Sequence, residues 1–592
     1  MTRAAAKGRR WAPHWAGLLW LRLKFSTPET VWLQRGLLVW AGLIGILGAL
    51  SSVAFRAAIG LMQVLLTSRS GGVVEAAMAL STGQRLLVPC LGGALSGLII
   101  VALRRFSGSQ PATDFMEAIV LGDGRMPVRP IVARCLSALV SIASGGAMGR
   151  EGPMVQLSSM LASVFGRRLG VRGPRLRLLV ACGVAAGIAS AYRAPIAGSL
   201  FVAEIVLGSI AMESFGPLVF AAVTATLTVR QLGEAGPLYG AVNHQLRASW
   251  EIIPFVFVGV LAGVLAPAFL RALGRARAAF ARLPPSPVVR LSAGGLGVGL
   301  LSVFCPEVWG NGYALVRALL EGPGPFSAVL ATAGLKLLAV LLTVGSGAIG
   351  GVFTPTLCMG ASLGSLFARA YHLAWTGPLP DAAAYALVGM GAFLAATTHA
   401  PLMAILMIFE MTLDYDVVLP LMLACVAAFF TASALGARSI YAEPLGRRPI
   451  IKPSWLGVSS DARGQLVAEA LGVEPVAVRT HDSFEQVARL FVKTGAQALF
   501  VLDEEQLLVG LISLADVQGA LEESYPKALV KAWDIMRADT RHVTPSTPLT
   551  EAAAQFLRDH RSSLPVVQDG AVKKLVGVLT REDVALALAQ RD

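Results

Sequence analysis

The stretch Gly149-Arg150-Glu151-Gly152-Pro153 places an arginine and a glutamate inside a long region rich in Gly, Ala and Leu. Charges in such an apolar setting cost free energy unless they are paired, face water or serve a function. Pro153 has no backbone N–H and suits the first turn of a helix, so the stretch predicts a loop that leads into a helix N-terminus. The N–H groups and the positive dipole end there favour an anion. A structural pair of Arg150 and Glu151 at a helix break is the alternative.

The composition is that of a membrane protein. Of 592 residues, 55% are hydrophobic and only 15% are charged, and several apolar segments exceed the roughly 18–20 residues that cross a bilayer. We therefore predict a polytopic α-helical membrane protein in a lipid bilayer. The net charge of +14 includes six basic residues before the first acid, Glu29, which predicts a cytoplasmic N-terminus. No basic patch interleaves with aromatic residues in the polar C-terminal region, which argues against nucleic-acid binding.

The apolar region contains an internal repeat. The run from Gly183 to Pro195 recurs from Gly389 to Pro401, displaced by 206 residues, and Glu204 then corresponds to Glu410. Two homologous halves with Gly-rich breaks are typical of transporters, whose broken helices meet around a central site.

The chain divides into five predicted regions. A basic cytoplasmic N-terminus with an interfacial helix covers residues 1–30, the membrane domain covers 31–445, and a linker covers 446–473. The remaining residues are polar and contain a second repeat, because Gly510–Asp516 matches Gly577–Asp583 with a displacement of 67. Each unit reads helix, strand, turn, strand, helix, which predicts two soluble α/β modules at 474–525 and 530–592.

Several motifs together resemble the CLC family of chloride channels and anion/proton antiporters, nearest to its bacterial ClcB-type branch. They are Gly149–Pro153, Gly351-Val352-Phe353-Thr354-Pro355, Tyr441, Tyr192–Phe201 and Val308–Tyr313. The soluble modules resemble a CBS pair. The resemblance implies a CLC fold with two inverted repeats of tilted, broken helices. It also implies a homodimer with one pore per subunit in a bacterial-type inner membrane, with the N-terminus and the CBS pair in the cytoplasm.

The resemblance also implies site residues. Glu151 becomes the gate, and chloride or a similar anion is held by residues of both motifs, namely Gly149, Arg150, Gly152, Val352, Phe353 and the hydroxyl of Tyr441. The family's first anion motif, Gly-Ser-Gly-Ile-Pro, reads Ser107-Gly108-Ser109-Gln110-Pro111 here. Gly108 therefore occupies the usual serine position, and either Ser109 or a backbone N–H supplies that contact.

A second departure concerns protons. Exchangers of the family carry an inner glutamate, and the position aligned from Pro195 is Ile205, which cannot carry a proton. The neighbouring Glu204 would point about 100° away on an α-helix, which favours a structural role such as capping or pairing. We therefore expect channel-like or weakly proton-coupled transport. A chloride/proton antiporter that uses another relay is the alternative.

The CBS pair resembles sensors of ATP, ADP or AMP. Ser513 with Asp516, and Thr580 with Asp583, have the spacing that suits a ribose, although a helix N-cap has the same pattern. We expect neither an enzyme nor a metal site nor a required cofactor. The seven histidines form no HExxH motif, the membrane region has no acidic cluster for a hard cation, and the six cysteines form no CxxC.

Overall fold

The chain forms two compact units, Met1–Arg447 and Arg448–Asp592, each of which is described by itself. The computed structural model describes these residues: 28–107, 114–120, 122–208, 210, 212–233, 236–239, 251–322, 324–374, 381–441, 466–471, 475–494, 496, 498–513, 516–517, 520, 530–538, 541–549, 551–552, 555–556, 563–568, 570, 573–580 and 583–584. The expected interfacial helix and most of the linker lie outside them.

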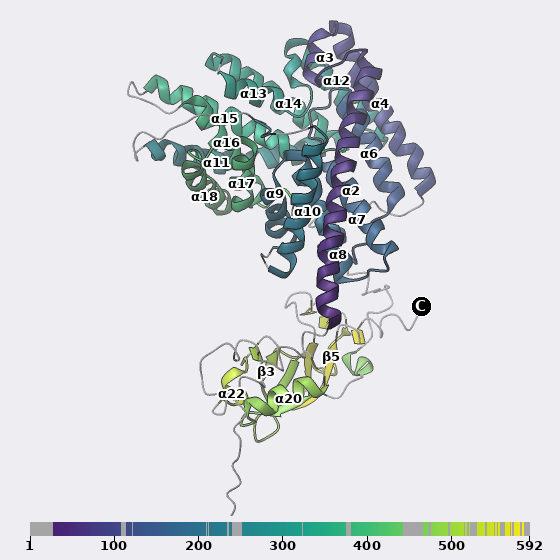
Figure 1. Cartoon of the computed structure of the whole chain (residues 1–592), viewed down its shortest axis with the longest axis vertical. Helices are drawn as coiled ribbons and strands as arrows, with labels where there is room; N and C mark the ends of the chain where they lie inside the picture. Colours follow the sequence, from purple (N-terminus) through teal and green to yellow (C-terminus); the bar gives the residue numbers. More distant parts are fainter. Residues whose placement is uncertain are drawn as a thin grey trace, which may run out of the picture. The chain divides into compact units, whose positions relative to one another are not determined.

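The regular elements of the first half of the unit Met1–Arg447 are all helices in its described part (Figure 1). Its elements are α2 (Pro28–Thr67), α3 (Val73–Ala79), α4 (Thr82–Ser107), α5 (Phe115–Val120), α6 (Val128–Ala143), α7 (Glu151–Arg168), α8 (Pro174–Tyr192), α9 (Pro195–Leu200), the π-helix η1 (Phe201–Leu207) and α10 (Met212–Gln231).

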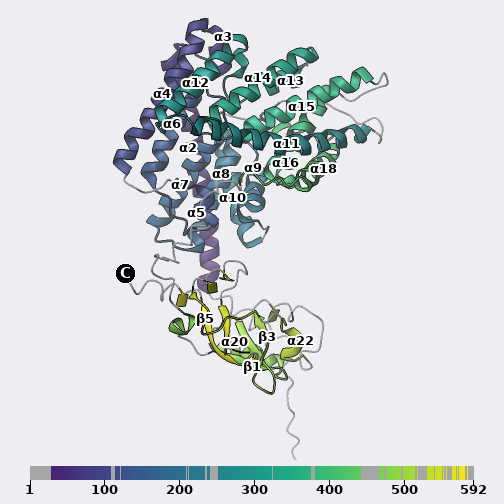
Figure 2. The ribbon, with the colours of Figure 1, turned by 180° about the vertical axis from the view of Figure 1, so that it is seen from behind.

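The second half repeats the pattern. Its elements are α11 (Ile252–Ala281), α12 (Pro287–Phe304), the 3-10 helix η3 (Pro306–Val308), α13 (Tyr313–Glu321), α14 (Phe326–Gly345), α15 (Phe353–Ala374), α16 (Ala382–Thr398), α17 (Pro401–Thr412) and α18 (Val418–Ala434). Helices α4 and α12 lie side by side on one flank, whereas α11, α16 and α18 pack together on the other (Figures 1 and 2).

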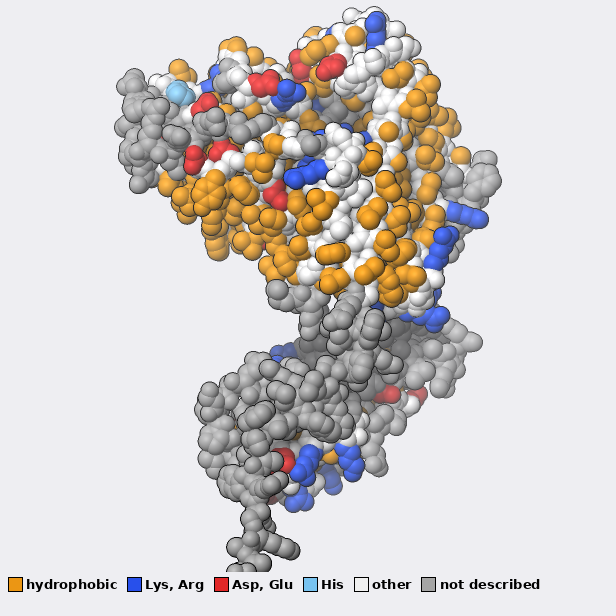
Figure 3. Space-filling model, viewed as in Figure 1, with side chains coloured by type: hydrophobic (Ala, Val, Ile, Leu, Met, Phe, Trp, Pro, Cys, Tyr) orange, Lys and Arg blue, Asp and Glu red, His pale blue; other side chains and the backbone are white. Residues whose placement is uncertain are grey.

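Six of the described helices are long and apolar enough to cross a membrane: α2, α4, α8, α11, α12 and α14. Four shorter apolar segments, at 195–207, 382–398, 401–412 and 418–434, match the expected broken helices. Large apolar side chains are exposed along α2 and α10, including Leu61, Leu65, Phe220 and Leu227, and orange side chains cover this face of the unit in Figure 3. An apolar exterior of this kind suits contact with lipid.

Reciprocal contacts relate the two halves. Gly93 of α4 lies against the backbone of Leu291 in α12, while Gly295 of α12 lies against the backbone of Pro89 in α4, so that a Cβ at either glycine would overlap the partner helix. Pairs of contacts that exchange in this way indicate an approximate twofold axis between the halves. The close approach depends on glycine at both positions.

Two glutamates cap helices across the same axis. The carboxylate of Glu204 accepts hydrogen bonds from the N–H groups of Leu402 (3.3 Å) and Met403 (2.8 Å) at the start of α17. Its repeat partner, Glu410, accepts from Ile196 (3.0 Å) and Ala197 (2.8 Å) at the start of α9. Each half therefore satisfies N–H groups that a helix N-terminus leaves without an intrahelical partner.

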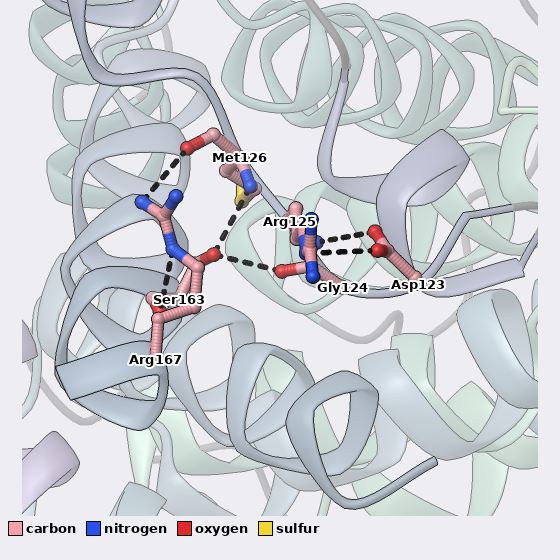
Figure 4. Close-up of polar contacts among 6 residues, drawn as sticks. All are labelled: Asp123, Gly124, Arg125, Met126, Ser163 and Arg167. Atoms are coloured by element: carbon pink, nitrogen blue, oxygen red, sulfur yellow. Dashed lines mark hydrogen bonds and ion pairs between the residues drawn. The ribbon is translucent and has the colours of Figure 1, made fainter. Parts of the chain in front are cut away.

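The loop that leads into α6 is fastened to α7, as Figure 4 shows. The buried hydroxyl of Ser163 donates to the carbonyl of Gly124 (2.7 Å) and accepts from the N–H of Met126 (3.0 Å). Arg167, one turn further along α7, donates to the carbonyls of Ser163 (3.3 Å) and Met126 (3.5 Å). Glu151 is the first residue of α7, and these bonds fix the opposite, C-terminal end of the helix.

The C-terminal unit confirms the expected repeat of α/β modules. In the first, α20 (Phe484–Thr494) precedes the antiparallel pair of β2 (Ala498–Leu502) and β3 (Leu508–Ser513), and β1 (Ala477–Arg479) joins β2 in parallel. The second contains the antiparallel strands β4 (Ser563–Val567) and β5 (Leu575–Thr580). The other short elements are η5 (Val467–Ala470) and α22 (Ala532–Ile535).

Candidate functional site

Two backbone hydrogen bonds join the glycine-rich motifs of the two halves. The N–H of Gly149 donates to the carbonyl of Gly351 (2.7 Å), and the N–H of Gly351 donates to the carbonyl of Gly149 (2.8 Å). Helix α7 begins at Glu151 and α15 at Phe353, so the bridge holds both helix N-termini next to each other. The predicted loop and helix start are therefore present, and they belong to a site that both halves build.

The side chain of Glu151 reaches across this bridge to the other half. Its Oε1 accepts from the backbone N–H of Thr354 and its Oε2 accepts from the Thr354 hydroxyl, both at 3.1 Å. Only 4% of Glu151 is exposed. A carboxylate at the N-terminus of α15 occupies a position where N–H groups and the helix dipole favour negative charge.

Glycine makes room for this carboxylate on two sides. A Cβ at Gly149 would overlap both carboxylate oxygens of Glu151, and a Cβ at Gly351 would overlap Oε1. The carboxylate thus fills a notch between the two bridged glycines. The glycines of both motifs permit this close approach.

Two hydroxyl residues that the sequence analysis did not single out lie next to Glu151: Thr354 binds its carboxylate, and Tyr192 contacts Thr354. The hydroxyl of Tyr192, at the end of α8, lies 3.0 Å from Thr354 Oγ1, and both residues are fully buried. Thr354 and Tyr192 stand inside quoted motifs, but 162 residues separate them. The position of Thr354 directly after Phe353 could have indicated this contact from the sequence, because hydroxyls at helix N-termini bind neighbouring polar groups.

A cavity of about 340 Å³ adjoins the carboxylate. It is lined by Glu151, Gly152, Val352, Phe353 and Tyr441 among others, so it brings together the predicted gate and four of the predicted anion-site residues. The aromatic rings form a connected series: Tyr192 and Phe353 are 4.9 Å apart between centroids, Phe353 and Phe201 6.4 Å, and Phe201 and Tyr441 5.3 Å.

The cavity also has polar lining residues that the sequence did not indicate. Asp114, Arg134, Gln156 and Arg277 all line it, and the Gln156 amide donates to the Asp114 carboxylate. Two arginines at the wall of a cavity attract anions.

Arg150 lies close to aromatic residues. Its guanidinium carbon is 5.5 Å from the centroid of the Tyr313 ring, within the range of a cation–π contact. Tyr313 begins α13 and is the last residue of the motif Val308–Tyr313. Gly149 forms the backbone bridge described above. Gly149 and Arg150 are not among the residues that line the cavity, whereas Gly152 is.

Two predicted positions lie outside the described residues. They are Gly108 and Ser109, so the contact expected from the first anion motif has no structural description. The structure does place Ile205: it belongs to η1 and packs against the apolar core. The α-helical spacing assumed for Glu204 and Ile205 is wrong, because this segment is a π-helix, in which more residues make up each turn.

The paired positions of the C-terminal unit form local hydrogen bonds. Asp516 accepts from the N–H (2.8 Å) and the hydroxyl (2.6 Å) of Ser513, and Asp583 accepts from the N–H (2.8 Å) and the hydroxyl (2.6 Å) of Thr580. Arg537 adds an ion pair to Asp516 at 2.7 Å. Burial raises the pKa of Asp516, but the hydrogen bonds from Ser513 and the charge of Arg537 outweigh it, so the net pKa is lowered.

Comparisons with known proteins agree with this architecture. The family model for voltage-gated chloride channels matches residues 92–433, and the CBS domain model matches 467–523 and 532–590. A putative chloride channel protein, ClcB-like, of Ralstonia nicotianae is 49% identical over 411 residues, which are 69% of this chain and 96% of the relative. The voltage-gated ClC-type chloride channel ClcB of Salmonella typhi is 42% identical over 413 residues, with shares of 69% and 98%.

Solved structures show the same fold. A slow cyanobacterial Cl⁻/H⁺ antiporter matches with a TM-score of 0.62 at 27% identity, covering 69% of this chain and 97% of the other. A eukaryotic CLC transporter matches with a TM-score of 0.60 at 19% identity over 93% of this chain and 98% of the other, which supports the fold alone. With a CBS pair following its membrane domain, the chain belongs to the CLC family of chloride channels and antiporters.

Proposed function

We propose that the chain moves chloride and similar monovalent anions across a bacterial inner membrane, with Glu151 as the gate of one pathway in each subunit of a homodimer. The observation that carries the proposal is the position of the Glu151 carboxylate on the N–H and hydroxyl of Thr354, at the start of α15. A buried carboxylate in a site suited to anions occupies the place that a permeating anion needs.

The donors for the anion come from the same helix start. The first four N–H groups of a helix have no intrahelical partner, and Pro355 has none to offer. With the Thr354 N–H bound to Glu151, the N–H groups of Val352 and Phe353 remain as candidate donors, together with the hydroxyl of Tyr441 across the cavity. Such partial charges hold an anion weakly enough for it to leave.

Protonation of Glu151 would open the pathway. A neutral carboxyl group loses most of its attraction to the helix N-terminus, so an anion can replace it. Chloride flux should therefore rise as pH falls. Glu151→Gln imitates the protonated group and should keep a high flux with little pH dependence in liposomes. A full wild-type pH response in this variant would remove Glu151 from the gate.

We also propose that chloride moves without strict coupling to protons. Ile205 packs against the apolar core where exchangers of the family place an acid, and the carboxylate of Glu204 is bound to the start of α17. A proton would have to cross this region without a free acidic side chain at either position.

Chloride/proton antiport is the second candidate, and one observation favours it. The cyanobacterial structure at 27% identity is named a Cl⁻/H⁺ antiporter. In that case a relay other than the usual inner glutamate would serve this chain. Recording chloride and proton fluxes together in the same liposomes separates the two functions, because antiport requires a fixed ratio of the two.

For the CBS pair, which we place in the cytoplasm with the N-terminus, we propose an adenine nucleotide as an optional ligand. Asp583 is the better candidate for the ribose, because Arg537 already pairs with Asp516. Asp583→Ala should lower the affinity of the full-length protein for ATP, ADP or AMP by about tenfold, the value of one charge-assisted hydrogen bond. Calorimetry that detects no heat with any of the three would favour the helix-cap role.

A further inference from the structure

We propose that the hydroxyls of Thr354 and Tyr192 hold Glu151 in its closed position and thereby set the pH at which the pathway opens. The inference rests on the proposed gating role of Glu151 and adds two positioning residues to it. Both hydroxyls belong to elements of different halves, α8 and α15, and meet only in the folded protein.

The contacts form a short chain of hydrogen bonds. Thr354 Oγ1 donates to Glu151 Oε2 at 3.1 Å, and the Tyr192 hydroxyl is 3.0 Å from the same Oγ1. An ionised carboxylate only accepts hydrogen bonds, and a threonine hydroxyl has a single proton. Since Thr354 gives that proton to Glu151, Tyr192 must be the donor in the second bond.

The direction of the chain matters for the charge on Glu151. A hydroxyl that accepts one hydrogen bond becomes a better donor in the next, so Tyr192 strengthens the bond from Thr354 to the carboxylate. Tyr192 and Thr354 are both 0% exposed, so water does not compete for these groups. This series of hydrogen bonds therefore favours the ionised, docked form of Glu151 over the protonated, released form.

Other groups also face Glu151. Arg150 precedes it on the same loop, and Tyr313 of α13 and Tyr441 lie within electrostatic range. The lining of the adjoining cavity adds three charged side chains, Asp114, Arg134 and Arg277. All of these remain in the variants below, so a change in pH response reports the two hydroxyls.

Thr354→Val removes the hydroxyl, retains the backbone N–H and keeps the shape of the side chain. Without the donor, the ionised docked form is less stable, so a smaller proton concentration releases Glu151. We expect the midpoint of the rise in chloride flux to move to higher pH by about one unit, a tenfold change, as for one charge-assisted hydrogen bond. Thr354→Ser retains the donor and should keep the wild-type midpoint.

Two further variants address the tyrosine. Tyr192→Phe should move the midpoint in the same direction but by less, because Thr354 can still donate. The double change Tyr192→Phe with Thr354→Val removes both hydroxyls of this pair, so neither is left buried without the other. It should match Thr354→Val in midpoint, and it remains informative if the single valine variant fails to fold.

Glu151→Gln separates this inference from the gating proposal. In a Glu151→Gln background, Thr354→Val should change nothing further, because no carboxylate remains to be held. If Glu151→Gln abolishes the pH response but Thr354→Val and the double variant both keep the wild-type midpoint, the hydroxyls do not set the gate. If Glu151→Gln keeps the pH response, the gating proposal itself fails, and with it this inference.

Discussion

Gly351→Ala should open the proposed gate, Glu151, without protonation of its carboxylate. A Cβ at this position would lie 2.5 Å from Cδ and 2.8 Å from Cγ of Glu151, whereas ordinary contacts begin at 3.4 Å. All the atoms nearest to the new methyl group belong to the flexible end of Glu151. The backbone of Gly351 does not have the left-handed conformation that favours glycine. Alanine is therefore tolerated, provided that the carboxylate moves away.

The size of the effect follows from the two bonds that hold the carboxylate. A shift of about 1 Å relieves the overlap but stretches bonds of 3.1 Å beyond hydrogen-bonding range. Each charge-assisted bond contributes about 1.5–3 kcal/mol, so the loss of two amounts to at least about 3 kcal/mol. That corresponds to roughly a 100-fold bias towards the released gate.

Chloride efflux from liposomes at neutral and at acid pH measures this directly. Gly351→Ala should show, at neutral pH, the flux that the wild type reaches only in acid. Gly274→Ala is the matched control, because a Cβ at that glycine in α11 meets no atom within 4 Å. If Gly351→Ala assembles normally and keeps the wild-type pH response, Glu151 is not held in the notch between the glycines.

Three further predictions concern other parts of the chain. Tyr441→Ala should weaken chloride or bromide binding in calorimetry or raise unselective leak, and unchanged binding and flux would exclude Tyr441 from the site. Glu410→Ala leaves the N–H groups at the start of α9 without their partner, so the unfolding temperature in detergent should fall, with about 1–3 kcal/mol lost; an unchanged temperature would contradict the capping role. The pKa of Asp516 is lower in the folded protein than in the unfolded chain, where it is about 4. Its stabilising effect is therefore present above the unfolded pKa and is lost as pH falls through the folded pKa. Asp516→Asn should thus destabilise the C-terminal unit at neutral pH and have little effect in strong acid, and an equal effect at both pH values would contradict this.

The repeat was visible in the sequence because its strongest signals are local. The run Gly183–Pro195 and its copy end α8 and α16, and Arg193 and His399 both have φ of +58° at the equivalent positions. For Glu204 the sequence predicted only a structural role such as capping or pairing, without its partners. Its partners Leu402 and Met403 lie almost 200 residues away, so no spacing in the sequence identifies them.

The candidate site was predictable in its motifs but not in its contacts. Sequence motifs located Glu151 and the start of α15, yet the bond from Thr354 to Glu151 depends on the backbone bridge between the halves. Tyr192 lies at the end of α8, which packs against α7, and its side chain reaches Thr354 and Phe353 at the start of α15. The π-helix at Phe201–Leu207 also escaped prediction, because its apolar residues are compatible with an α-helix.

The zero-current potential of liposomes that contain the purified protein tests the central claim most directly. The liposomes carry a chloride gradient with an opposing pH gradient or with none. If the pathway is gated by Glu151 and not strictly coupled to protons, its current should reverse at the chloride equilibrium potential. That potential should not respond to an imposed pH gradient. Proton uptake against its gradient, driven by chloride, would contradict the account and establish the chain as an antiporter.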